Sequence, residues 1–166
     1  NDILTADSII NDWAEEDIAN VLFGYGEEHF ARKIALKIVE VRKKAPIKTT
    51  FELVTVIESA VPAWYRKRRI HPATKTFQAL RIAVNSELES LRTVLKDGWR
   101  LLKPNGRLGV ISFHSLEARI VKEFFNQKKL DQEGELITKK VIKPELSEIE
   151  ANPRSRSAQL RVIKKI

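Results

Sequence analysis

Hydroxyl, imidazole and carboxylate side chains lie close together at the end of an apolar run at 108–113 and directly after it. Such a run is typical of a strand covered on both faces. Apolar residues then recur at helical spacing from Leu116, which predicts a helix with Ser115 as its N-cap. Because open α/β sheets bind ligands just beyond the carboxyl ends of their strands, this segment is a candidate pocket wall. A cap and a turn residue without further function would give the same pattern. The candidates are Ser112, His114, Ser115 and Glu117.

A second segment combines aromatic and cationic side chains, since Trp64 and Tyr65 are followed by four consecutive cations. Cations contact nucleic-acid phosphates and aromatic rings stack on bases, so the run predicts contact with nucleic acid. A solvated connector would have the same composition. The cations are Arg66, Lys67, Arg68 and Arg69.

Two further polar groups are candidates for binding an anion or lining a cleft. A helix predicted from Pro72 carries polar residues on one face, and a face turned to solvent rarely has Thr, Gln and Asn in place of Glu and Lys. Near the C-terminus, arginines and serines at 152–157 suit a phosphate or a carboxylate. A polar row buried against other helices, or a surface turn, would explain them equally. The residues are His71 just before the helix, Thr74, Gln78, Arg81 and Asn85 on it, and Arg154 and Arg156 near the C-terminus.

The composition excludes several kinds of site. The chain has no Cys, hence no disulfide and no thiolate metal ligand, and its three His residues are too scattered for a metal motif. It has no Gly-rich phosphate loop. No apolar run approaches the roughly 20 residues that a membrane span requires. We therefore expect neither a metal site nor a membrane partner.

Charge is unevenly distributed along the 166 residues. Residues 1–30 contain eight Asp or Glu and no Lys or Arg, whereas the rest carries 30 basic against 14 acidic residues, a net charge of +16. Such an excess favours an anionic partner. The chain begins at Asn1 and contains no Met, so we expect it to be a piece of a longer protein.

Hydrophobic periodicity predicts a helical first part and a mixed second part. The second part has the order helix, strand, helix, strand, strand, and its last two strands are expected to be antiparallel. This order suits half of an α/β sheet with an antiparallel edge. The predicted helices cover 5–13, 15–25, 27–44, 49–60 and a long seam at 72–102 that Gly98 could kink or break, and the later strands cover 136–142 and 159–163.

Three long segments, in this order, resemble one family: His71–Asn85, Val110–Glu117 and Asn152–Arg161. They look like the bacterial small-subunit ribosomal RNA cytosine-N4 methyltransferases, the RsmH or MraW family. Tyr25–Glu28 and the residues after it are similar to the same family. The resemblance runs through the whole chain.

The resemblance implies a class I, Rossmann-like methyltransferase that uses S-adenosylmethionine and carries an inserted helical domain. Residues 1–70 would be most of that insertion, and residues 71–166 would be the C-terminal half of the catalytic domain. The main cofactor-binding residues are expected upstream of Asn1, so none is assigned in this chain. We expect these residues by themselves to be inactive.

The implied substrate is the exocyclic N4 amine of a cytosine in 16S ribosomal RNA of the small subunit, in the cytoplasm. The segments His71–Asn85 and Ser112–Glu117 would form the far wall of the base pocket, and the basic run would meet RNA phosphates. A homodimer is left open. The charge alone would equally suit a non-catalytic, ribosome-associated RNA-binding module, or a helical interaction domain with an incidental basic surface.

Overall fold

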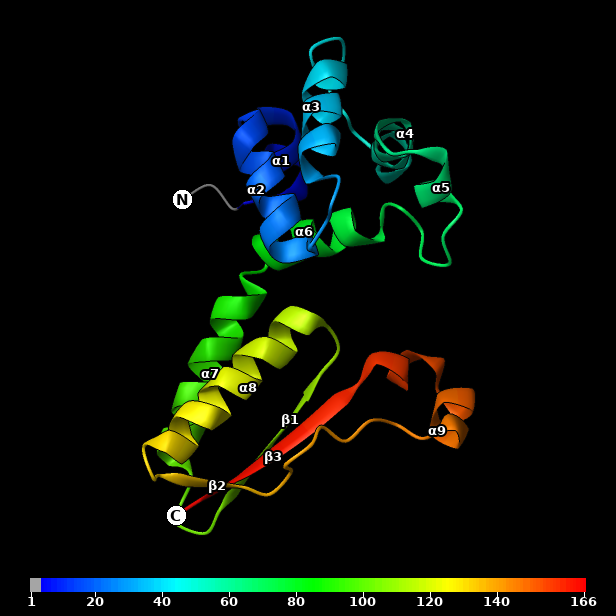
Figure 1. The fold of residues 1–166 in the computed structure, drawn as a ribbon. Helices are drawn as coiled ribbons and strands as arrows, with labels where there is room; N and C mark the ends of the chain where they lie inside the picture. The colour runs from blue at the N-terminus through cyan, green and yellow to red at the C-terminus, as the bar shows by residue number, and fades with distance from the viewer. Residues whose placement is uncertain (1–3) are drawn as a thin grey trace. The chain divides into compact units, whose positions relative to one another are not determined.

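The computed structural model describes residues 4–166, which form two compact units, one ending at Glu87 and one running from Leu88 to Ile166 (Figure 1). The boundary expected from the sequence lies earlier, at residue 70. Helix α6 (Thr74–Val84) packs closely on α2 (Glu15–Gly26) and so belongs to the compact helical unit. The assignment of residues 71–166 to a methyltransferase domain stays a prediction.

The first unit is built from helices whose starts are encoded locally. The sequence leaves the first cap open between Thr5 and Asp7 and the fourth between Thr49 and Thr50. The structure shows Thr5 and Thr49 as the N-caps, each with a complete capping box. Most of the core of this unit is formed by buried aliphatic side chains of successive helices, among them Ile18, Leu22 and Ile34, which are fully buried. The remaining helices of the unit are α1 (Ala6–Asp12), α3 (Ala31–Arg42), α4 (Thr50–Ala60) and the short α5 (Ala63–Arg66).

The helix predicted over 27–44 begins later, at Ala31. Glu27 has a φ of 48°, and its N–H closes the last turn of α2 on the carbonyls of Leu22 and Phe23. Glu28 is buried instead of starting a helix, and its carboxylate accepts the Phe30 N–H at 2.9 Å. Two adjacent acids resemble a helix start in sequence, but here one of them belongs to the cap of the preceding helix.

The seam predicted over 72–102 is two helices, α6 and α7 (Glu87–Leu101). The break lies at Ser86, which has a φ of 48°. Gly98, the expected break point, lies inside α7. The apolar residues keep their helical spacing across the break. This spacing therefore cannot predict that a single residue adopts the left-handed conformation.

The second unit contains a three-stranded antiparallel sheet in the order β1–β3–β2. β3 (Gln159–Lys165) is central and pairs with β1 (Arg107–Ser112) and with β2 (Gly134–Leu136). The predicted antiparallel pairing of the last two strands is confirmed. β2 is shorter and earlier than the strand expected at 136–142, of which only Ile142 adds a bridge, to Leu160. Within residues 4–166 the strands pair only antiparallel, so the Rossmann-like core implied by the resemblance stays a prediction.

Helix α8 (Ser115–Leu130) contacts all three strands, as Figure 1 shows. The core of this unit includes Trp99, Phe125 and Ile163, each no more than 5% exposed. Ile111 of β1 is 57% exposed, so the expectation that this strand is covered on both faces is wrong for the described residues. The connection from β2 to β3 contains α9 (Leu146–Ala151) and the 3-10 helix η1 (Pro153–Ser157).

Candidate functional site

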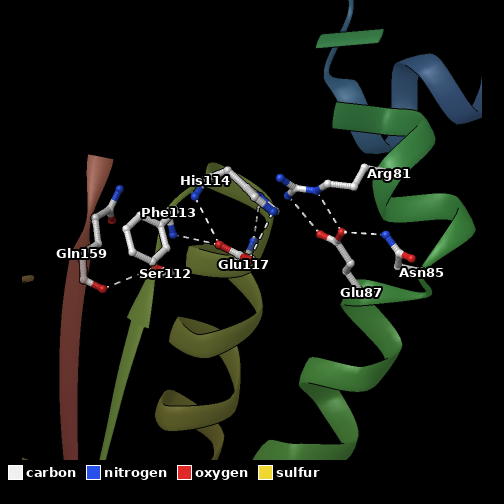
Figure 2. A network of polar contacts seen from close by, with 8 residues as sticks. All are labelled: Arg81, Asn85, Glu87, Ser112, Phe113, His114, Glu117 and Gln159. Atoms are coloured by element: carbon white, nitrogen blue, oxygen red, sulfur yellow. Dashed lines mark hydrogen bonds and ion pairs between the residues drawn. The ribbon is translucent and has the colours of Figure 1, made fainter. Parts of the chain in front are cut away.

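The turn after β1 is organised by a reciprocal helix cap (Figure 2). His114 is extended, with φ −137° and ψ 167°, and is the N-cap of α8, so the prediction of Ser115 as the cap is wrong by one residue. The Glu117 N–H donates to His114 Nδ1 at 3.4 Å. In return, Glu117 Oε2 accepts the N–H groups of Phe113 at 2.8 Å and His114 at 3.3 Å. A ring nitrogen therefore takes the place of the more usual hydroxyl acceptor.

The cap fixes which proton His114 carries. Because Nδ1 accepts a hydrogen bond, the neutral ring holds its proton on Nε2. Nε2 is buried, lies 3.4 Å from Glu117 Oε1 and makes no hydrogen bond. In this tautomer Nε2 can donate but cannot accept a proton. His114 therefore cannot serve as a general base while it caps α8.

The other candidates of this turn are also engaged or face solvent. Ser112 is buried, and its hydroxyl donates to the Gln159 carbonyl at 3.4 Å (Figure 2). Ser115 is exposed in the first turn of α8. The Ser112 hydroxyl is bonded to β3, and the Glu117 carboxylate is bonded to the backbone of the turn, so neither group is free to bind the hydroxyls and amine of S-adenosylmethionine. We assign no cofactor contact to this chain, and the role of the turn as a pocket wall stays a prediction.

In the first unit, the basic run is exposed throughout but not uniform. The Arg68 guanidinium lies 4.9 Å from the ring centroid of Trp64 and 5.0 Å from that of Tyr65. Across residues 4–166, none of the ion pairs involves a cation of this run. Arg68 is therefore a cation held by two aromatic rings, with its charge uncompensated.

Tyr65 is held from behind by Glu28. Its hydroxyl donates to Glu28 Oε2 at 2.7 Å, and its ring lies 4.9 Å from that of Phe30 in an edge-to-face arrangement. Burial and the hydrogen bond to Glu28 raise the pKa of Tyr65 to about 12, so the hydroxyl remains a donor at neutral pH. Glu28 is missing from the candidates found by sequence reasoning. The available signal is the Tyr25–Glu28 motif, in which the sequence pattern makes Glu28 part of a helix start.

A cavity of about 310 Å³ opens beside Arg68. Lys75 donates to the Glu27 carbonyl at 2.7 Å, and His71 Nε2 lies 3.5 Å from Glu58 Oε1. The structure thus brings part of the basic run together with His71, which precedes α6, and Lys75 in its first turn. The cavity is lined by Tyr65, Arg68, Arg69, Ile70, His71 and Lys75.

Two side chains of the polar row predicted along α6 are already bonded to an acid of the same chain. Arg81 makes a bidentate ion pair with Glu87, Nε–Oε1 2.8 Å and Nη2–Oε2 3.0 Å, and Asn85 donates to the same carboxylate at 3.4 Å (Figure 2). Thr74 is exposed and Gln78 is half-buried. To contact RNA, Arg81 and Asn85 would have to break their hydrogen bonds to the Glu87 carboxylate, so their assignment as RNA contacts stays a prediction.

Arg154 and Arg156 are exposed on η1, with Ser155 buried between them. The Ser155 hydroxyl donates to the Asn152 carbonyl at 2.8 Å, which shapes this turn locally.

Two buried polar atoms elsewhere were not predicted from the sequence: Thr76 Oγ1 and Arg161 Nε are buried without a hydrogen-bond partner. Neither residue type nor spacing predicts these two atoms, because the burial of a single atom depends on how the chain packs. In the described part of the chain no helix is long and apolar enough to cross a membrane.

A model of the MraW methylase family matches residues 1–166. The chain is 52% identical over 162 residues to a protein of Coprothermobacter proteolyticus and 51% identical over 163 residues to one of Synechococcus elongatus, each match covering 98% of this chain and 53% of the relative. A protein of Treponema denticola is 48% identical over 180 residues, covering 98% and 56%. All three are named ribosomal RNA small subunit methyltransferase H, and the chain spans about half of their length. The resemblance seen in the sequence is confirmed, and the chain belongs to the MraW methylase family.

Proposed function

We propose that this chain is part of an S-adenosylmethionine-dependent methyltransferase that methylates the N4 amine of a cytosine in 16S ribosomal RNA, in the small ribosomal subunit and hence in the cytoplasm. The observation that carries the proposal is the family match over all 166 residues, with relatives named for small-subunit ribosomal RNA methylation. Cofactor binding is assigned to the part of the relatives that this chain does not span.

The chemistry explains why such an enzyme needs what this chain offers. The lone pair of the N4 amine is delocalised into the cytosine ring, so the amine must be oriented precisely toward the methyl group it attacks. The target base must also leave its stack and enter a pocket. Both requirements demand a firm hold on the surrounding RNA. In this chain, the exposed and uncompensated cations at 66–69 supply such a hold.

In this proposal, different segments of the chain contact the target base and the RNA backbone. The Ser112–Glu117 turn forms a wall of the base pocket. The polar residues of the His71–Asn85 segment contact the RNA. The His114 Nε2–H is buried, lies 3.4 Å from Glu117 Oε1 and makes no hydrogen bond, so it is suited to donate to an oxygen or ring nitrogen of a base that enters the turn. The RNA backbone is held by the basic run and by Arg154 and Arg156.

The test is a methylation assay with the complete protein, purified small ribosomal subunits that lack the modification, and S-adenosylmethionine. Digestion to nucleosides and mass spectrometry should reveal N4-methylcytidine only when all three are present. Binding to the subunit without any methylated nucleoside would instead support the non-catalytic RNA-binding module. Sedimentation analysis of the same protein would decide whether it is a homodimer.

A further inference from the structure

The cations of the basic run differ in how firmly they are held. Arg66 and Lys67 project from the end of α5 without an aromatic contact in the described structure. Arg68, by contrast, lies against the rings of Trp64 and Tyr65. Tyr65 is only 5% exposed and is bonded to the fully buried Glu28, so the surface that holds Arg68 is anchored in the core of the helical unit. A guanidinium positioned in this way loses less side-chain entropy when it binds an anion.

The cavity beside Arg68 combines positive charge with apolar surface. Arg68, Arg69 and Lys75 lie on its wall, and none of its six lining residues is acidic. The acid that faces this wall is Glu58, which lies 3.5 Å from His71. Tyr65 and Ile70 supply apolar surface, and Ile70 is 58% exposed at this position. The volume of about 310 Å³ is at the lower end of the range for small-molecule sites, in which a single nucleotide fits.

We propose that this cavity binds one nucleotide of the substrate RNA, with its phosphate on Arg68 and Arg69 and its base against Tyr65 and Ile70. This inference rests on the proposed function and adds to it a defined RNA subsite in the helical unit. Arginine pairs with a phosphate through two parallel N–H groups, and an aromatic or aliphatic wall accepts any base. The subsite therefore selects RNA with an unstacked nucleotide without reading its sequence.

The bound nucleotide is not the one that is methylated. A cytosine awaiting methylation needs an acceptor for its N4 amine, and the charged side chains that line the cavity, Arg68, Arg69 and Lys75, are donors. The Glu58 carboxylate does not line the cavity and lies against His71. The Nδ1 acceptor of His71 is already used by the Ala73 N–H at 3.2 Å. The cavity is thus suited to a neighbouring nucleotide, which would fix the RNA while the target base enters another pocket.

The experiment measures affinity of the complete protein for a fluorescein-labelled, single-stranded 12-nucleotide RNA by anisotropy at fixed salt. Arg68→Ala should weaken binding at least about tenfold, whereas the matched control Arg66→Ala should weaken it only about two- to threefold. Arg68→Lys should not restore binding, because an ammonium cannot form the planar, bidentate contact. Equal effects of Arg68→Ala and Arg66→Ala would overturn the proposal.

The base is tested by filling the cavity without changing charge. Ile70→Trp, or Ile70→Phe as a milder version, should weaken RNA binding about tenfold. Because Ile70 is exposed, the melting temperature should stay near that of the wild type. Unchanged RNA affinity in both Ile70 variants would show that the RNA contacts the arginines only through a phosphate and that no base enters the cavity. This result would overturn the nucleotide subsite. A protein that produces N4-methylcytidine but gives either negative result retains the proposed function and loses this inference.

Discussion

The Tyr65 hydroxyl donates a 2.7 Å hydrogen bond to the carboxylate of Glu28, which has no exposed surface. The second carboxylate oxygen accepts the Phe30 N–H, so both oxygens of a buried acid are satisfied. This pair joins the α2–α3 junction to α5, 37 residues later. A buried carboxylate is tolerated only when its oxygens are bonded, so Tyr65 and Glu28 depend on each other.

Replacing Tyr65 with Phe should destabilise the protein by about 1–3 kcal/mol, because it leaves one oxygen of a buried charge without a donor. Denaturant unfolding measures the difference. The control is Tyr25→Phe, which removes the same hydroxyl from a side chain that is 37% exposed and should change stability by less than about 0.5 kcal/mol. Equal effects of the two substitutions would contradict a structural role for the buried pair.

The same pair predicts a pH dependence on the alkaline side. The pKa of Tyr65 rises from 10.0 to about 12, so the folded state disfavours the ionised phenol. Its contribution to stability is complete below pH 10.0 and is lost as the pH rises toward about 12. The melting-temperature gap between wild type and Tyr65→Phe should therefore narrow over this interval. A constant gap would mean that Tyr65 ionises equally in both states.

Two glycines of α2 should respond in opposite directions to Ala. A Cβ on Gly26 would lie 2.6 Å from the Lys75 carbonyl oxygen, so Gly26→Ala should force α2 and α6 apart and cost about 1–3 kcal/mol. Gly24 has no atom within 4 Å of that position, and Gly24→Ala should add about 0.5–1 kcal/mol through helix propensity. Thermal unfolding of both variants checks the signs, and a destabilised Gly24→Ala would refute the argument.

Helix capping and a role in catalysis can be separated at His114. His114→Ala should cost about 1 kcal/mol, because it removes the N-cap of α8, while His114→Asn keeps a good cap and should be near wild type. If the imidazole lines the base pocket, His114→Asn should still slow methyl transfer in single-turnover assays. Glu123→Ala, an exposed change on α8, is the control for both measurements. Wild-type turnover in His114→Asn would leave this residue a purely structural role.

The four cations at 66–69 should determine much of the salt dependence of RNA binding. Replacing all four with Ala in the complete protein should lower the slope of log affinity against log salt by roughly 0.7 to 0.9 for each RNA phosphate that the variant no longer neutralises. Lys43→Ala with Lys44→Ala removes two exposed cations at the end of α3 and serves as the control. An unaltered slope in the fourfold variant would show that the run is merely solvated.

Features that neighbouring residues encode can be predicted from the sequence. Thr5 and Thr49 cap helices through bonds within three residues, so their spacing reveals them. At the start of α8, residue type favours Ser115 as the N-cap, but His114 is the extended residue and is the N-cap instead. The left-handed φ of Ser86 breaks the helix where the apolar pattern does not.

Features that depend on distant partners are out of reach of the sequence. Nothing near Glu28 indicates that its partner is Tyr65, or that both are buried. The basic run is visible as a composition, but the distinction of Arg68 from its neighbours needs the positions of two rings. Likewise, the apolar run of β1 predicts two covered faces, and only the packing shows Ile111 exposed.

The sheet order has a consequence for how the protein is made. β1 and β2 both pair with β3 and not with each other, and β3 is the last of the three to be synthesised. On the ribosome, β1 must therefore wait without a partner until residues 159–165 emerge, while the helical unit is already complete and built from contacts among earlier residues. The order of synthesis thus favours early folding of the helical unit and late, cooperative closure of the sheet. A nonsense codon before residue 159 would remove all the strand pairings of the described sheet at once.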